Sequence, residues 1–333
     1  MNKSIQGTMR AIITTKYGSP NVLQLQYVQK PKPKSNEILV KIKAASVTRA
    51  DTMMRKGTPW LGRLFIGLTK PKYPISGTGF SGVVKAVGKD VTKFEVGNAV
   101  FGESTFGAGT NAEYLCIAES GILTHKPKKL LHEEAATICD GPLTSYNFLK
   151  EMAGVQPGQS VLINGASGSL GTAAVQLAKH LGAEVTGVCS TQNIGMVISL
   201  GADKVIDYTK MDFTTIGDTY DVIFDTVGKR SYSSCKAALK PKGIYLSPVL
   251  SLSLLFQVVW TSMFGRKKAK FSATGTKPIA SLLELITELM ALVESGQLKA
   301  IIDKIYSLEE IKKAHEYVDT GRKRGNVIIS LQS

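Results

Sequence analysis

The residues whose types and spacing could bind a cofactor lie in the middle of the chain. Gly165, Gly168 and Gly171 follow the apolar run 161–163 at G-x-x-G-x-x-G spacing, and apolar residues then recur with helical spacing over 173–181. A strand that turns into a helix through glycines brings backbone N–H groups and the positive helix end up to a pyrophosphate. The segment therefore predicts a dinucleotide site. A tight strand–helix turn without a ligand is the alternative.

Strands and helices are expected to alternate after this turn. The expected strands are 184–189, 204–206, 221–225 and 243–246, and the expected helices are 194–200 and 231–239. Such alternation is typical of a parallel, doubly wound sheet. The glycine turn then follows a strand of this sheet, at the edge where such sheets bind their ligands.

The N-terminal part of the chain has a different pattern. Short apolar or alternating runs predict strands at 9–13, 22–28, 37–45, 80–87, 99–101 and 112–117. Closely spaced glycines separate several of these runs, which favours a compact β-rich domain. The tail is expected to form a helix over 279–294, a strand over 300–305, a helix over 308–319 and a strand over 326–331.

Composition limits the classes of partner. The 333 residues include 41 Lys and Arg and 26 Asp and Glu, a formal net charge of +15, which favours anionic ligands. The basic residues are scattered without interleaved aromatic residues, so nucleic acid is not expected as a main ligand. The four cysteines form no C-x-x-C pair and indicate buried free thiols in a reducing compartment. Residues 1–8 contain no apolar signal core, so a cytoplasmic location is expected.

One long apolar run needs its own explanation. Residues 244–264 approach the length of a membrane span, and a basic segment follows at 266–270. Pro248 and Gln257 interrupt the run, and its first residues are needed as a strand. A helix that covers the substrate cleft or lies between subunits is the favoured interpretation. The alternative is peripheral membrane contact through an interfacial helix over 249–265, whose basic flank holds it to anionic lipid.

The glycine turn is one of several segments that follow each other in a familiar order. The others include 77–88, 94–102, 109–114 and 141–145. Together they resemble the zinc-independent quinone oxidoreductase branch of the medium-chain dehydrogenase/reductase superfamily, to which zeta-crystallin also belongs. The resemblance covers nearly the whole chain from Met9.

The resemblance implies an α/β protein with two domains. A GroES-like β-rich catalytic domain is expected at 1–128 and again at 271–333, and a Rossmann domain with a doubly wound parallel sheet that binds NADP is expected at 129–270. The active cleft would lie at their junction. A homodimer is implied by the family alone.

The positions that hold catalytic zinc in related alcohol dehydrogenases lack the necessary side chains. Residues 45–51 include no Cys, and residues 77–79 include neither His nor Glu. Without thiolate or imidazole ligands, no tetrahedral zinc site is expected. Direct hydride transfer from a nicotinamide to an electron-poor acceptor is expected instead. The candidate catalytic residues are Thr48, which stands where relatives commonly have Asn, and Asp51; a turn hydroxyl and a helix cap are their structural alternatives.

The end of the second Rossmann strand distinguishes NADPH from NADH. An acidic residue there would bind the ribose 2′-hydroxyl, whereas this strand ends in Cys189-Ser190-Thr191. Ser190 and Thr191 can donate hydrogen bonds to a 2′-phosphate, and the resemblance places Tyr208 beside that phosphate, so NADPH is favoured. From the turn and the resemblance together, the residues expected to bind the cofactor are Thr144, Gly165, Ser167, Gly168, Ser169, Leu170, Ser190, Thr191, Tyr208, Val227 and Asn326.

The sequence thus predicts an NADPH-dependent, zinc-independent oxidoreductase that transfers hydride to quinones or α,β-unsaturated carbonyls. Two alternatives stay open. One is a reductase of small aldehydes or enones without quinone activity. The other, suggested by the apolar run, is a cofactor-binding protein with little turnover at a membrane surface.

Overall fold

The computed structural model describes residues 7–104 and 109–331. Residues 1–6, on which the expected location partly depends, lie outside this description. The chain divides into two compact units: unit 1 comprises Met1–Asp140, Gly275–Met290 and Ile302–Ser333, and unit 2 comprises Gly141–Thr274 and Ala291–Ile301. The expected boundaries follow residues 128 and 270, whereas these two units divide after residues 140 and 274, and residues 291–301 of the tail join unit 2.

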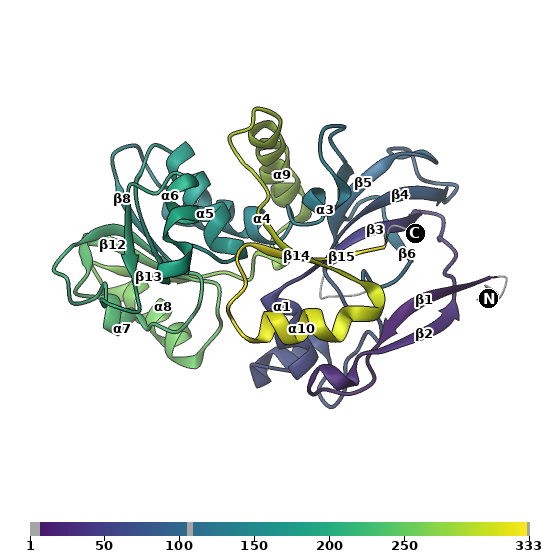
Figure 1. Ribbon diagram of the computed structural model, residues 1–333, viewed down its shortest axis with the longest axis horizontal. Coiled ribbons are helices and arrows are strands. Elements are labelled where there is room, and N and C mark those ends of the chain that lie inside the picture. Colours follow the sequence, from purple (N-terminus) through teal and green to yellow (C-terminus); the bar gives the residue numbers. More distant parts are fainter. Residues whose placement is uncertain (1–6, 105–108, 332–333) are drawn as a thin grey trace. The chain divides into compact units, whose positions relative to one another are not determined.

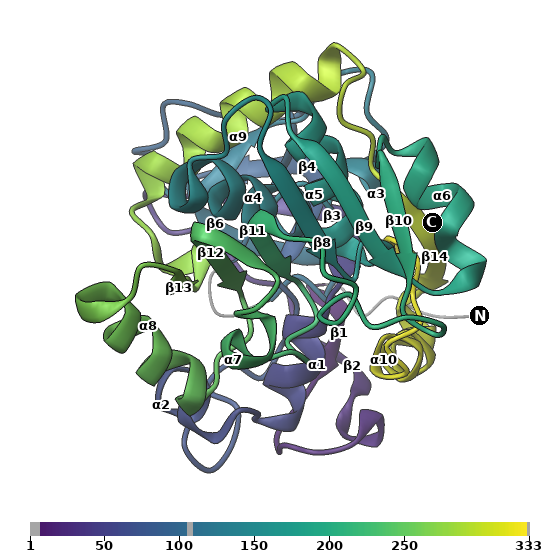
Figure 2. The ribbon, with the colours of Figure 1, turned by 90° about the vertical axis from the view of Figure 1, so that its left-hand side faces the viewer.

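A six-stranded sheet forms the centre of unit 2 (Figure 2). Its strands pair in the order β10 (Lys204–Asp207), β9 (Glu184–Cys189), β8 (Ser160–Asn164), β11 (Tyr220–Asp225), β12 (Leu239–Ser247) and β13 (Lys268–Phe271). Every neighbouring pair is parallel. Numbered along the chain, this order is that of a doubly wound dinucleotide-binding sheet. The structure therefore confirms the predicted Rossmann fold.

Helices follow the strands of unit 2, as the alternating pattern predicts. They are α4 (Gly141–Tyr146), the π-helix η4 (Asn147–Ala153), α5 (Ser169–His180), the short η5 (Thr191–Asn193), α6 (Ile194–Ser199), α7 (Tyr232–Cys235) and α8 (Leu252–Phe264). The helix expected over 231–239 is a single turn, because β12 already begins at Leu239. The strand β13 was not predicted, since its two lysines suggested only a basic flank.

Antiparallel strands dominate unit 1 (Figure 1). β1 (Thr8–Ile13) and β2 (Gln24–Gln29) form a small sheet of their own. The larger sheet has the order β14 (Ile302–Ser307), β15 (Asn326–Ser330), β3 (Glu37–Val47), β4 (Gly79–Val87), β5 (Ala99–Glu103) and β7 (Ile122–His125), and β6 (Tyr114–Ala118) also pairs with β3. The tail thus returns to the N-terminal portion, because β15 is antiparallel to β3 with Ile328 opposite Ser46.

Short helices complete unit 1. They are α1 (Arg49–Lys56), α2 (Arg63–Ile66), α3 (His132–Ala135), α10 (Ile311–Asp319) and the single turns η1 (Pro20–Val22), η2 (Trp60–Gly62) and η7 (Leu308–Glu310); α9 (Ile279–Glu294) and η6 (Thr274–Thr276) cross the boundary between the units. α10 is amphipathic, and Ile311, Ala314 and Val318 join the core beneath the sheet.

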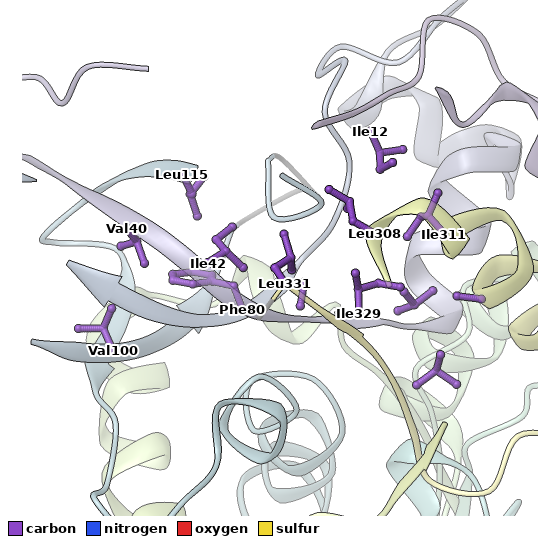
Figure 3. Close-up of a cluster of buried hydrophobic side chains, with 14 of the residues drawn as sticks. Ile12, Val40, Ile42, Phe80, Val100, Leu115, Leu308, Ile311, Ile329 and Leu331 are labelled. Atoms are coloured by element: carbon purple, nitrogen blue, oxygen red, sulfur yellow. The ribbon is translucent and has the colours of Figure 1, made fainter. Parts of the chain in front are cut away.

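The core of unit 1 fixes the position of α1. Buried side chains of the sheet, among them Ile42 and Phe80, pack with Leu308 and Ile311 of the tail (Figure 3). Val47, the last residue of β3, belongs to the same cluster, and α1 begins two residues later. The residues between strand and helix are therefore held by a rigid strand end.

Candidate functional site

The glycine turn of unit 2 has the geometry of a phosphate-binding turn. Gly165 follows β8 with a φ of +81°, and a Cβ at this position would lie 2.4 Å from Cγ2 of Val227. A Cβ at Gly171 would lie 2.1 Å from the carbonyl oxygen of Gly165. Both positions are thus closed to any side chain. The residues present fit the bound pyrophosphate of a dinucleotide, because the turn is tight and ends at a helix N-terminus.

The first turn of α5 forms the second part of this cradle. Its N-cap, Gly168, has no side chain that could accept a hydrogen bond from the first turn, so the positive end of the helix keeps its affinity for an anion. Ser145 of α4 donates a hydrogen bond from its hydroxyl to the carbonyl oxygen of Leu170 at 2.9 Å. Thr144, another residue predicted to bind the cofactor, precedes Ser145 and is half-buried.

Asn193 joins the glycine turn to the end of β9. Its amide donates hydrogen bonds to Oγ of Ser167 at 3.0 Å and to Oγ of Ser190 at 3.2 Å. The structure therefore brings together two predicted cofactor residues that are far apart in the sequence. Asn193 itself was missed, because nothing in the local pattern distinguishes it from other helix-start residues.

A carboxylate lies at the end of β10, beside the end of β9. Asp207 pairs with Cys189 in the parallel register, and the hydroxyl of Thr191 donates a hydrogen bond to Oδ2 of Asp207. The hydroxyl of Thr209 donates to Oδ1 at 2.7 Å. These hydrogen bonds, that of Thr191 foremost, hold the pKa of Asp207 below its ordinary value.

Asp207 changes the interpretation of the 2′-phosphate site. The end of β9 itself carries no acidic residue. Parallel strands end at the same edge, however, so the acidic residue at the end of β10 is a neighbour of that position. Thr191 has a single hydroxyl proton, which it already donates to Asp207. Tyr208 remains available, because its side chain is 62% exposed.

Asp225, the last residue of β11, holds the loop that contains Val227. Its fully buried carboxylate accepts hydrogen bonds from the side chain of Asn164 at 2.8 Å and from the backbone N–H groups of Val227 and Gly228 at 3.1 Å. The hydroxyl of Tyr245 donates to its second oxygen at 3.1 Å. The predicted cofactor residue Val227 is thus fixed beside the glycine turn, where it is 43% exposed.

In unit 1, Thr48 and Asp51 form a capping box at the start of α1. Oγ1 of Thr48 accepts a hydrogen bond from the backbone N–H of Asp51 at 3.2 Å. Oδ2 of Asp51 accepts from the backbone N–H and from the hydroxyl of Thr48, both at 2.7 Å. The structural alternatives considered for these two residues are therefore present, since each caps the helix. This arrangement alone does not assign them a catalytic role.

The surroundings of Asp51 are unusual for a cap. Its side chain is buried, and Oδ1 has no hydrogen-bond partner within residues 7–104 and 109–331. Burial raises the pKa of Asp51 to about 7, and the nearby Asp140 adds to this rise. Burial and the same neighbour raise the pKa of Glu103 to about 8. A group of acidic side chains in unit 1 is thus partly protonated near neutral pH.

Asp51 also lines a small cavity of about 30 Å³ in unit 1. Thr14 and Arg55 line the same cavity, and both are buried. Oγ1 of Thr14 and Nε and Nη1 of Arg55 lack a hydrogen-bond partner in the described part of the chain. A cavity of this size holds a water molecule, which would satisfy several of these groups together. Sequence reasoning could not find this set, since Thr14 is far in the sequence from Asp51 and Arg55 of α1.

Asn326, the remaining predicted cofactor residue, lies in unit 1. It is the first residue of β15 and is buried. The other predicted cofactor residues belong to unit 2, so a role for Asn326 in cofactor binding stays a prediction. The described residues contain no group of three or more His, Cys, Asp or Glu that could hold a metal ion.

Comparison with known proteins identifies the family. A family model described as alcohol dehydrogenase GroES-like domain matches residues 34–128, and one described as zinc-binding dehydrogenase matches residues 200–329. The 2-methylene-furan-3-one reductase of Solanum lycopersicum is 32% identical over 338 residues, which cover 98% of this chain and 80% of that protein. The chain belongs to the medium-chain dehydrogenase/reductase superfamily, in its quinone oxidoreductase branch.

Solved structures of this superfamily share the fold. The quinone oxidoreductase of Coxiella burnetii has a TM-score of 0.87 and 28% identity, covering 98% of this chain and 100% of that chain. The Escherichia coli quinone oxidoreductase, solved in complex with NADPH, has a TM-score of 0.83 and 26% identity, covering 96% and 99%. The superfamily and the fold class predicted from the sequence are therefore confirmed, and the chain is an oxidoreductase of the quinone or enone reductase type.

Proposed function

We propose that this protein is an NADPH-dependent oxidoreductase that reduces quinones or α,β-unsaturated carbonyls without zinc. The observation that carries the proposal is the glycine turn, which the Ser167–Asn193–Ser190 contacts connect to the end of β9. Two relatives support the class of reaction. One is named a reductase of an enone, and the Escherichia coli quinone oxidoreductase was solved with NADPH.

The residues of the chain have distinct tasks in this proposal. A bound nicotinamide supplies a hydride. Gly165, Gly171 and the start of α5 hold the pyrophosphate, and Asp225 fixes the loop at Val227 against the cofactor. Asp51, which lines the small cavity and has one oxygen without a hydrogen-bond partner in the described part of the chain, holds the proton that the reduced product requires. Thr48 positions Asp51 through the three hydrogen bonds between the two residues.

The proposed independence from zinc differs from what one matched family model, zinc-binding dehydrogenase, would suggest. The segments 45–51 and 77–79 contain no thiol or imidazole, so the ligands of a tetrahedral zinc site are missing there. Elemental analysis of the purified protein should find no stoichiometric zinc, and a chelator should leave the activity intact. Stoichiometric zinc together with loss of activity on chelation would overturn this part of the proposal.

The experiment that tests the activity is a substrate panel. The full chain is mixed with NADPH and with quinones, enones and small aldehydes in turn, and NADPH oxidation is followed. Turnover of quinones or enones is expected. Turnover restricted to small aldehydes and enones would favour the first alternative. NADPH binding without turnover of any compound would favour the second alternative, a cofactor-binding protein at a membrane surface.

The assembly and location belong to the same proposal. A homodimer is proposed from the family alone, and a cytoplasmic location is proposed from the four free cysteines. Sedimentation velocity of the purified chain tests the dimer, and fractionation of cells tests the location.

A further inference from the structure

The helix α8 carries its apolar face on the outside. Six large apolar side chains recur along one side of the helix at a spacing of three or four residues, and each is between 54% and 71% exposed: Leu252, Phe256, Val259, Trp260, Met263 and Phe264. The rings of Phe256 and Trp260 stack with centroids 6.1 Å apart, and those of Trp260 and Phe264 are 5.0 Å apart. An ordinary surface helix shows the opposite pattern.

The other side of α8 is anchored to unit 2. Leu254 is buried in the core of that unit. Oγ1 of Thr261 accepts a hydrogen bond from the backbone N–H of Ala269 in β13 at 2.9 Å, and Nζ of Lys268 donates to the carbonyl oxygen of Thr261 at 2.7 Å. The orientation of the helix is therefore set by specific contacts, and the apolar face is directed away from the sheet.

The chain around α8 contains no acidic residue. Residues 226–283 include ten Lys and Arg and neither Asp nor Glu. Lys229, Lys236 and Arg266 are exposed. Lys267 is placed beside Lys236, because its Nζ donates a hydrogen bond to the carbonyl oxygen of Lys236 at 2.7 Å. The apolar face thus belongs to a stretch of chain whose charged residues are all basic, although Arg230 pairs with Asp212 and Lys240 with Asp221.

Unit 1 contains a second segment of the same kind. Four of its large apolar side chains are between 60% and 65% exposed. Trp60 lies in η2, Leu64 and Phe65 lie in α2, and Leu68 follows α2. Residues 52–89 again contain no Asp or Glu, and they include seven Lys and Arg.

We propose that both apolar segments, α8 and 60–68, dock on the surface of an anionic lipid bilayer. Exposed Trp, Phe and Leu side chains enter the boundary between headgroups and acyl chains, while the surrounding lysines and arginines bind lipid phosphates. No helix of the described residues is long and apolar enough to cross a membrane, so the contact is peripheral. A second copy is the less suitable occupant of α8, because a two-fold interface would bring together two copies of a stretch, 226–283, in which every charged residue is basic.

The chain offers a direct probe for each segment. Its only two tryptophans are Trp60 and Trp260. The variant Trp60→Phe reports on α8, and Trp260→Phe reports on segment 60–68. Each variant is mixed with vesicles of phosphatidylcholine and phosphatidylglycerol that carry brominated acyl chains. The remaining tryptophan should shift its emission to the blue and be quenched. Vesicles of phosphatidylcholine alone should bind at least about ten-fold more weakly, because they carry no net charge and roughly 1 kcal/mol of electrostatic attraction is lost for each Lys or Arg near the surface.

Exposed positions provide variants that should leave the fold intact. The double variant Phe256→Ser/Met263→Ser should lower vesicle binding in sedimentation by about ten-fold or more. The matched control is Ile198→Ser on α6, since Ile198 is 54% exposed outside both segments, and its binding should be unchanged.

Three results would overturn the proposal. The first is tryptophan emission that does not change on addition of anionic vesicles in either single-tryptophan variant. The second is equal binding to neutral and anionic vesicles. The third is a double variant that binds vesicles as well as the unaltered chain does but is a monomer in sedimentation velocity where the unaltered chain is a dimer. That result would assign the apolar face of α8 to contact with a second copy.

Discussion

The hydroxyl of Thr191 donates a hydrogen bond to the carboxylate of Asp207. This hydrogen bond joins the segment that follows β9 to the last residue of β10. This contact places a negative charge beside the strand end that selects between NADPH and NADH. Ser190 and Tyr208 still favour a phosphate, whereas Asp207 opposes it. The proposed preference for NADPH would therefore depend on the balance between these opposing groups, and substitutions could shift it in either direction.

Removing the charge of Asp207 should strengthen NADPH binding. In Asp207→Asn, NADPH affinity should rise about five-fold relative to NADH affinity, because an unfavourable interaction of about 1 kcal/mol with the 2′-phosphate is lost. Fluorescence titration with both cofactors measures the ratio. The control is Asp203→Asn, since the carboxylate of Asp203 accepts a hydrogen bond from the N–H of Val185 near the opposite end of β9. An unchanged ratio in Asp207→Asn would show that the carboxylate lies too far from the phosphate.

Two glycines of the same turn should respond differently to alanine. In Gly171→Ala the new methyl group would meet the carbonyl oxygen of Gly165 at 2.1 Å, so both the melting temperature and NADPH binding should fall. In Gly168→Ala the nearest atom would be 3.5 Å away and the φ is −82°. The melting temperature of this variant should be nearly unchanged, while NADPH affinity falls about ten-fold, because the methyl group approaches the pyrophosphate. Full NADPH affinity in Gly168→Ala would place the phosphates elsewhere.

The sequence predicted the sheet of unit 2 because its signals are local. The buried run 161–163, the glycines and the helical spacing that follows all occur within some twenty residues. Asp207 was overlooked for the opposite reason, since its importance depends on the register between β9 and β10 rather than on its own neighbours. The sequence could not predict that the apolar face of α8 is exposed. An apolar run usually indicates burial, and only the three-dimensional structure shows which side of the helix is covered. The tail was placed in the first domain only by the family resemblance, since no local signal marks β15 as the partner of β3.

The stability of unit 1 should fall as the pH rises towards 8. Burial raises the pKa of Asp51 to about 7 and that of Glu103 to about 8, so the folded chain retains protons that the unfolded chain has released. Their contribution is fully present below the unfolded pKa values, near 4, and is lost as the pH passes through 7 and 8. Above pH 8 the effect of Lys323 is opposite, because burial lowers its pKa to about 8.

Urea denaturation at several pH values between 5 and 8 measures this effect. The midpoint should decrease with pH, and Glu103→Gln should make the decrease smaller. The control is Glu95→Gln, since Glu95 is an exposed acidic residue of the same unit. A midpoint independent of pH in the unaltered chain would mean that water reaches these carboxyl groups.

Asp51 can be tested as the proton source. If it holds the transferred proton, kcat should fall above pH 7 in the unaltered chain, where Asp51 ionises. Asp51→Asn keeps an acceptor for the cap but should lower kcat by about a hundred-fold and remove this inflection. NADPH affinity should not change. Thr48→Ser, which preserves the capping hydroxyl, serves as the control with near-normal kcat. Normal turnover in Asp51→Asn would leave Asp51 as a helix cap only.

The pairing of β15 with β3 sets an order of assembly during synthesis. All the strands of the sheet in unit 2 lie within residues 160–271, so they leave the ribosome together and can pair before the chain is finished. Strand β3 emerges much earlier, yet its neighbour β15 spans Asn326–Ser330. The end of β3 at residues 44–47 therefore stays without its partner until residues 327–330 are translated. A nascent chain that stalls before residue 326 carries an open strand edge, which makes it a target for chaperones and for aggregation.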